Sequence, residues 1–238
     1  MKIYNFLPLA IMLPFFFTSC EKIKGEGPVI SETRTVNQFS GIELNIHATI
    51  NFTQGPNQML ELKGQSNMLN ILETYVAGSN LVIKFRNDIK IGKHEPITIN
   101  ISAPDLNNIV INGSGKIITT GNLANNESKL QVNGSGNIEI KQLNVLKLDA
   151  VIAGSGDIKI VQGTANEERL KIIGSGNFYL GDILAKDVHT HISGSGNTEV
   201  NVTDNLNVVI EGSGNVYYKG QPQQVNTTIT GSGKVLRL

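Results

Sequence analysis

The sequence predicts an all-β protein built as a right-handed parallel β-helix, with about 20 residues per coil and a less regular β-rich portion before the regular coils. Two observations predict this fold: a Gly-Ser-Gly tripeptide that recurs, and apolar residues at fixed places on either side of it. A repeat of this length with strand-like alternation is typical of a solenoid, whose coils bury their apolar faces against one another. Successive tripeptides are 21, 20, 20, 20, 18 and 19 residues apart, and they begin at Gly113, Gly134, Gly154, Gly174, Gly194, Gly212 and Gly231.

The apolar positions beside the tripeptide assign an inner and an outer face to each strand. Because alternate residues of a strand share a face, the two sets below are expected in a common interior. The residues two places before the tripeptide are Ile111, Val132, Ile152, Ile172, Ile192, Ile210 and Ile229. Those four places after its first glycine are Ile117, Ile138, Ile158, Phe178, Thr198, Val216 and Val235.

The same count by twos places both glycines of each tripeptide inside and the serine outside. A residue without a Cβ atom permits positive φ and close approach of another backbone, so the glycines are expected to form a corner of each coil. The alternative is an antiparallel meander in which each tripeptide is a hairpin turn, but hairpins need not keep a constant spacing. The handedness follows the rule for parallel crossovers. The expected corner glycines are Gly113, Gly115, Gly134, Gly136, Gly154, Gly156, Gly174, Gly176, Gly194, Gly196, Gly212, Gly214, Gly231 and Gly233.

Residues 39–105 are rich in strand patterns but lack the tripeptide, which begins in the regular portion, residues 106–238. The segment "GIELNIHATINFTQG" alternates apolar and polar residues, and "SNMLNIL" reads as one helical turn. Gly78-Ser79-Asn80 separates two further strands. This portion is interpreted either as irregular early coils or as a sheet that caps the solenoid.

The first residues, "MKIYNFLPLAIMLPFFFTSC", read as a secretory signal with a charged start and an apolar run. The alternative, a membrane-spanning helix, needs about twenty apolar residues, whereas this run is shorter and contains Pro8 and Pro14. Cys20 ends the segment in a context that resembles the lipobox of bacterial lipoproteins. Residues 1–19 are therefore predicted to be a lipoprotein signal peptide, Cys20 to be lipidated, and residues 20–38 to tether the domain to a membrane, most simply the outer membrane on its periplasmic or surface face.

Residues 39–238 resemble a known family. The pieces "FSGIELNIHATINFTQG", "LETYVAGSNLVIKF", "ITINISAPDLNNIVINGSG" and the repeated "GSGN" are similar to the head GIN domain, described as a putative auto-transporter adhesin. This resemblance implies a β-helix-like fold in exported bacterial proteins, often lipoproteins, at the cell surface or in the periplasm. It implies no catalytic residue.

One outward column of side chains is a candidate binding surface. It lies five places past the first glycine of each tripeptide, and surface pairing of charges and aromatics is its simpler explanation. An enzyme that cleaves acidic polysaccharides would need clustered carboxylates on one outer face. The two glutamates of the column are three coils apart, about 14 Å, which is too far for a glycosidase pair. The column residues are Glu139, Lys159, Tyr179, Glu199 and Tyr217.

No metal or cofactor site is predicted. His189 and His191 share an outer face and could chelate a metal, but a third ligand does not stand out, so a solvated pair is the preferred interpretation. Calcium-binding rolls use a nine-residue repeat rich in aspartate, whereas here an aspartate, Asp157, follows only one of the seven tripeptides. The formal net charge of zero gives no general attraction to nucleic acid.

These observations predict a non-catalytic, lipid-anchored cell-envelope protein, an adhesin or binding module that presents its repetitive surface to a glycan or a protein. The alternatives are a structural scaffold of the envelope and, less favoured, a carbohydrate-active β-helix enzyme. The final segment "TITGSGKVLRL" leaves a strand edge that Lys234 and Arg237 could guard or a homo-oligomer could cover.

Overall fold

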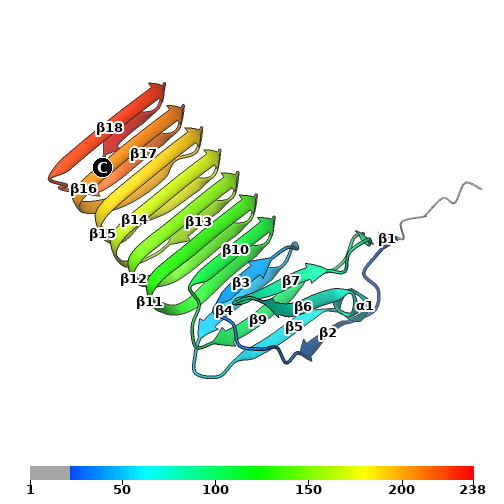
Figure 1. The fold of residues 1–238 in the computed structure, drawn as a ribbon. Helices are drawn as coiled ribbons and strands as arrows, with labels where there is room; N and C mark the ends of the chain where they lie inside the picture. Colours follow the sequence, from blue (N-terminus) through cyan, green and yellow to red (C-terminus); the bar gives the residue numbers. More distant parts are fainter. Residues whose placement is uncertain (1–21) are drawn as a thin grey trace, which may run out of the picture.

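The computed structural model describes residues 22–238, so the predicted signal peptide and Cys20 lie outside the described residues. The chain forms a parallel β-solenoid of about 6 turns, spaced about 20 residues apart, which confirms the predicted fold class. Figure 1 shows the stacked strands running from β10 to β18, with a less regular region at the opposite end. Within the described residues, no helix is both long and apolar enough to cross a membrane.

The regular strands pair in parallel, coil on coil, and the tripeptides stay in register from Gly113 to Gly231. The antiparallel meander is thereby excluded for this part of the chain. These strands are β10 (Asn108–Gly113), β11 (Lys116–Gly134), β12 (Asn137–Gly154), β13 (Asp157–Ile160), β14 (Gly163–Gly174), β15 (Asn177–Gly194), β16 (Thr198–Gly212), β17 (Asn215–Gly220), β18 (Gln224–Gly231) and β19 (Lys234–Arg237).

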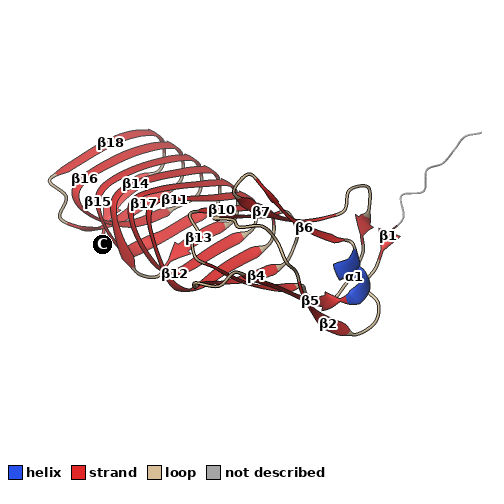
Figure 2. Ribbon diagram, turned by 60° about the horizontal axis from the view of Figure 1, so that its bottom comes forward, coloured by secondary structure: helices blue, strands red, loops and turns tan. Residues whose placement is uncertain are grey.

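Each coil has three straight sides, which the burial pattern of β12 makes clear. Buried and partly exposed residues alternate except at Lys141–Gln142 and Leu146–Lys147, where two successive residues are not buried. These two steps and the tripeptide are the corners of the coil. We call residues 137–140 and their equivalents side 1, residues 143–145 side 2, and residues 148–153 side 3; Figure 2 shows the turns stacked into one elongated body.

The interior contains the residues that the repeat predicts. The side chains two places before the tripeptide are fully buried from Ile111 to Ile210, and those four places after its first glycine are at most 1% exposed from Ile117 to Val216. Burial of each such side chain contributes about 1.5–3 kcal/mol. The two exceptions are Ile229, 41% exposed, and Val235, partly buried, because no described strand covers β18 and β19 on their outer side.

The two glycines of each tripeptide have different roles. The second, such as Gly156, is buried, and a Cβ there would collide with the carbonyl oxygen of Gly136 in the preceding coil. The first, such as Gly154, has a φ of 139° and is only partly buried, with its missing Cβ directed at the backbone of Gly134. The expectation that both glycines point inward is therefore wrong for the first, because positive φ breaks the alternation at that residue.

The carbonyl group of the first glycine also joins the coils. The oxygen of Gly134 accepts hydrogen bonds from the backbone N–H groups of Ser155 at 2.8 Å and Gly156 at 3.1 Å, and the same pair of bonds recurs in later coils. The serine side chains are exposed, as expected. Among the described residues, one direct hydroxyl–hydroxyl hydrogen bond joins neighbours in this row, between Ser213 and Ser232 at 3.1 Å.

The residues after the five middle tripeptides form a ladder that we call the amide ladder; its members are Asn137, Asp157, Asn177, Asn197 and Asn215. Asn177 Oδ1 accepts hydrogen bonds from the backbone N–H of Asn197 at 3.0 Å and from its Nδ2 at 3.2 Å. Asn197 receives the same two bonds from Asn215, and Asp157 receives them from Asn177. The ladder supplies partners to backbone groups where the chain leaves the corner.

Residues 41–103 continue the solenoid but not in chain order. β3 (Gly41–Leu44) lies in parallel between β10 and β7 (Asn80–Phe85), and β4 (Thr49–Gln54) lies in parallel between β11 and β9 (Thr98–Ala103). The first coil in the chain is thus the second in the stack. The strands β5 (Met59–Gln65) and β6 (Leu72–Ala77) extend the sheet in antiparallel fashion, and α1 (Ser66–Asn70) forms the expected helical turn.

The segment before β3 is partly built into this region. β1 (Lys22–Ile23) pairs with β8 (Lys90–Ile91), and β2 (Val29–Thr33) pairs with β5. The guanidinium of Arg34 also donates to the carbonyl oxygens of Leu69 and Leu72 at 2.7 and 2.6 Å. This differs from the expectation of a tether over residues 20–38, because two short strands within that segment, of 2 and 5 residues, find partners.

Candidate functional site

The candidate column lies on side 1, and the structure brings its five members together. Each is the direct register partner of the next on adjacent parallel strands, in the order Glu139, Lys159, Tyr179, Glu199 and Tyr217. Adjacent strands are about 4.8 Å apart, so the column runs along the stack as a continuous strip. We call it the side 1 column.

The charges of the side 1 column are only partly paired. Glu139 forms an ion pair with Lys116, in which Oε2 and Nζ are 3.1 Å apart. Lys159 makes no ion pair with any residue in the described part of the chain, and it stands between Glu139 and Tyr179. A charged group without a partner at the surface remains available to a ligand.

Tyr179 is the most exposed aromatic residue of the column, with 39% of its surface accessible. Partial burial raises the pKa of its hydroxyl, and the negative charges of Asp157 and Glu199 raise it further. The phenol therefore stays protonated and can donate a hydrogen bond, while the ring offers an apolar face.

Two open hollows flank Lys159 and Tyr179. One, of about 200 Å³, lies toward Glu139 and includes Lys116 and Asp157. The other, of about 320 Å³, lies toward Glu199 and includes Asp182, which pairs with Lys219. An aromatic ring between two hollows lined by both apolar and charged groups is an arrangement that can hold a chain of rings bearing hydroxyl groups.

The register also tests the enzymatic alternative. Glu139 and Glu199 are separated by the strands of Lys159 and Tyr179, three strand steps in all or about 14 Å. Glycosidase carboxylates lie roughly 5 to 10 Å apart. These two glutamates do not form such a pair.

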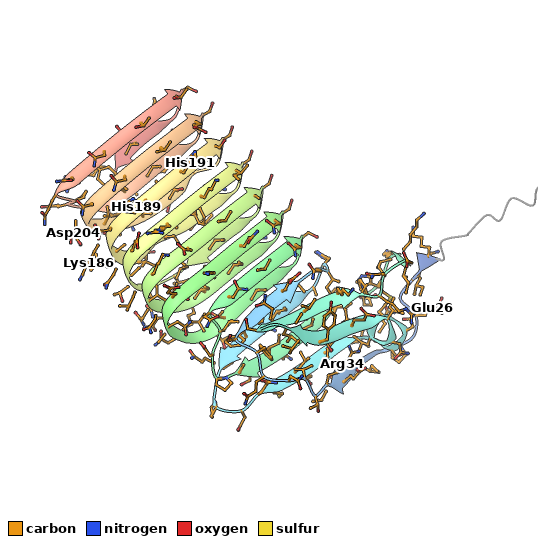
Figure 3. The ribbon with its side chains drawn as sticks, viewed as in Figure 1. Glu26, Arg34, Lys186, His189, His191 and Asp204 are labelled. Carbon is orange, nitrogen blue, oxygen red and sulfur yellow. The ribbon has the colours of Figure 1, made fainter. Side chains whose placement is uncertain are left out.

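His189 and His191 lie on the outer face of β15, on side 3 rather than side 1 (Figure 3). His189 Nε2 is 4.0 Å from Glu167 Oε1, and His191 Nε2 is 3.4 Å from Glu211 Oε2. Residues 22–238 contain no group of three or more side chains that could hold a metal ion. A third ligand for this pair is therefore not found in the described part of the chain.

The profile of a family described as "Putative auto-transporter adhesin, head GIN domain" matches residues 38–222. The chain belongs to the head GIN domain family. This adhesin-like family indicates an extracellular or cell-envelope protein. Among curated proteins, none matches the chain.

Solved structures of other bacterial proteins share the fold. A putative adhesin from Bacteroides fragilis is 25% identical, with a TM-score of 0.84 over 91% of this chain and 100% of that one. A putative adhesin from Parabacteroides distasonis is 24% identical, with a TM-score of 0.76 over 92% of this chain and 100% of that one. A protein from the same organism described as a putative lipid binding protein is 23% identical, with a TM-score of 0.76 and the same coverage.

Two features of this head GIN domain were not anticipated from its sequence. Glu168 is fully buried in the core, although counting by twos back from Ile172 places it on the inner face. The asparagines of the amide ladder follow five successive tripeptides except at Asp157, a pattern considered above only as a test for calcium ligands. The inward position of Glu168 and the recurring asparagine can both be read from the repeated sequence.

Proposed function

We propose that this chain is a non-catalytic, lipid-anchored cell-envelope protein that binds a glycan through the side 1 column. The observation that supports binding most directly is the position of Tyr179 between two hollows that combine apolar surface with charged side chains, next to the unpaired cation of Lys159. Sugar rings combine apolar CH faces with hydroxyl groups. A tyrosine ring can pack against the former, while the carboxylates, amides and ammonium group of the hollows bind the latter.

The repetition of the column favours an extended ligand over a small one. The hollows are open, and neither encloses a molecule as the deep pockets for small ligands do. A polymer can contact several coils in succession, so that weak contacts at each coil add up. A protein partner with an extended acidic or hydroxyl-rich surface is the alternative ligand for the same column.

The anchoring part of the proposal rests on Cys20 and on the start of the described chain. β1 begins at Lys22, two residues after Cys20, and lies in the region farthest from β18 (Figure 1). A lipid on Cys20 would hold this end at a membrane surface and leave the regular coils projecting from it. The outer membrane is the proposed location.

Glycan binding is tested with the purified protein on a glycan array, followed by titration of any hit. Tyr179→Ala and Lys159→Ala are expected to weaken binding at least 10-fold each, about 1.4 kcal/mol. Lys186→Ala, an exposed lysine at a distant corner, is the matched control and should bind normally. An array without hits, or equal affinity for all four proteins, would contradict the assignment.

Anchoring is tested separately in cells. Cys20→Ala is expected to release the protein from the membrane fraction and to abolish labelling by a palmitate analogue. Protease treatment of intact cells then reports whether the solenoid faces outward. A homo-oligomer remains a prediction, which light scattering over a range of concentrations checks.

A further inference from the structure

A groove on side 3 is a second surface whose shape and charge indicate a ligand. It has a volume of about 420 Å³ and crosses four strands, from Asp149–Val151 to Asn207–Val209. Its floor contains Ala150, Leu170 and Thr190, which point inward. We call it the side 3 groove. Two outward columns border it in strand register: Asp149, Arg169, His189 and Asn207 on one side, and Val151, Lys171, His191 and Val209 on the other.

The second of these columns is apolar at both ends and basic in the middle. Val151 is partly exposed and Val209 is 37% exposed, while Lys171 and His191 lie between them. From Val110 to Thr228 the column contains no carboxylate, since its members are Val110, Gln131, Val151, Lys171, His191, Val209 and Thr228. The next residue of the column is Glu43 on β3, four strand steps or about 19 Å from Lys171, so no strand near Lys171 offers it a counter-charge in this column.

Lys171 differs in this respect from the other cation of the groove. The guanidinium of Arg169 is held by Glu167, with Nε and Oε1 2.6 Å apart. Lys171 is exposed and makes no hydrogen bond or ion pair with the described residues. The free positive charge of the groove is thus at Lys171, beside an apolar strip.

His191 is a second polar side chain of the groove with an atom that makes no hydrogen bond. Its Nε2 atom is buried and has no hydrogen-bond partner within residues 22–238. Glu211 Oε2 is 3.4 Å away, but not in the orientation of a hydrogen bond. The His191 side chain as a whole is 39% exposed, so a ligand can contact the ring, and its Nε2 atom becomes available to a ligand hydroxyl when the Glu211 side chain turns away.

We propose that the side 3 groove is a binding site for an acidic polysaccharide, distinct from the side 1 column. The carboxylate of a uronic acid residue pairs with Lys171, a ring hydroxyl binds His191, and the apolar faces of neighbouring rings pack on Val151 and Val209. Four strands span about 14 Å, so the chain lies across them in an extended form. The open groove suits a partly solvated polymer better than an acyl chain, which would leave its apolar surface in water.

The experiment measures binding of the purified protein to immobilised polygalacturonate, hyaluronan and alginate. At least one is expected to bind, more weakly at high salt because part of the attraction is between charges. Methyl-esterified pectin, in which the carboxylates of polygalacturonate are blocked, is expected to bind at least 10-fold more weakly wherever polygalacturonate binds. Failure of all three acidic polymers to bind would overturn the proposal.

Variants locate the site. Lys171→Gln is expected to lower affinity for the acidic polymer at least 10-fold, and Lys171→Arg to retain most of it. Lys186→Gln removes an exposed lysine outside both surfaces and should leave this binding unchanged, while Lys159→Gln reports any contribution of side 1. Equal loss in Lys159→Gln and Lys171→Gln would overturn the side 3 groove, as would no loss in either. Loss in Lys159→Gln alone would instead assign the acidic polymer to side 1, so failures of the two proposals are distinguishable.

Discussion

Glu168 provides the sharpest test of the packing inside the solenoid. Its side chain is fully buried, and neither carboxylate oxygen has a hydrogen-bond partner in the described structure. Leu148 and Val188 are its register neighbours on the adjacent strands. Burial in these apolar surroundings raises the pKa of Glu168 from 4.5 to about 8. The folded protein therefore keeps this carboxyl neutral at pH values where the unfolded chain has released the proton.

The difference between the pKa values of Glu168 in the folded and unfolded states makes the free energy of unfolding depend on pH. Below pH 4.5 both states are protonated and the group contributes no pH dependence. As pH rises from 4.5 to 8, the unfolded state gains stability by ionising, so the free energy of unfolding falls; above pH 8 both states are ionised and the fall ends. At about 1.4 kcal/mol per pKa unit, the total loss is at most about 5 kcal/mol.

The assay compares urea unfolding of the wild-type protein and Glu168→Leu by circular dichroism at pH 5, 7 and 9. The leucine variant has no buried carboxyl to ionise, so it should lose several kcal/mol less than wild type between pH 5 and pH 9. Glu199→Gln, which removes a surface carboxylate, should keep the wild-type slope. The same pH profile in wild type and Glu168→Leu would refute the reasoning, because it would mean that the carboxylate is hydrated or paired in solution.

Three further substitutions test the solenoid itself, each by thermal or urea unfolding. Gly156→Ala should cost about 3 kcal/mol or more, because the added Cβ overlaps the carbonyl oxygen of the preceding coil, whereas Ser155→Ala, on an exposed side chain, should be nearly neutral. Asn197→Ala should cost about 1–3 kcal/mol, since it leaves two donors of the next coil without their acceptor; a negligible change would show that water replaces the amide ladder. Ile172→Asp should destabilise the fold by about 4 kcal/mol or more and Lys171→Asp hardly at all, and equal effects would contradict the assignment of inner and outer faces.

The regular coils were predictable because the same alternation of inward and outward side chains recurs around every tripeptide. The side chain of Ile172 and its equivalents can be assigned to the interior by alternation alone, and alignment of the tripeptides is enough to place the side 1 column in register. The orientation of Gly154 could not be obtained in this way, because a single positive φ interrupts the alternation on which the count depends. Glu168 was missed because the count was applied only close to the tripeptide.

The candidate surfaces were predictable to different degrees. The side 1 column needed only strand register, which the spacing of the tripeptides supplies. The side 3 groove depends on the partners of each charge: Arg169 is held by Glu167 while Lys171 is free, and both are simply basic residues in the sequence. The position of β3 between β7 and β10 was also beyond sequence reasoning, because residues 41–44 pair with segments that begin at residues 80 and 108.

This interleaving of β3 and β4 has a consequence for how the chain folds. The second coil of the stack is synthesised first, and both of its neighbours are made later, so its two edges stay open until residue 108 and the strand after it have emerged. Such long-range pairing is slow to form. Once it is complete, β10 and β11 present a finished template on which each new coil adds in turn. We therefore expect folding to be vectorial, with a slow first assembly followed by rapid growth away from the amino-terminal region.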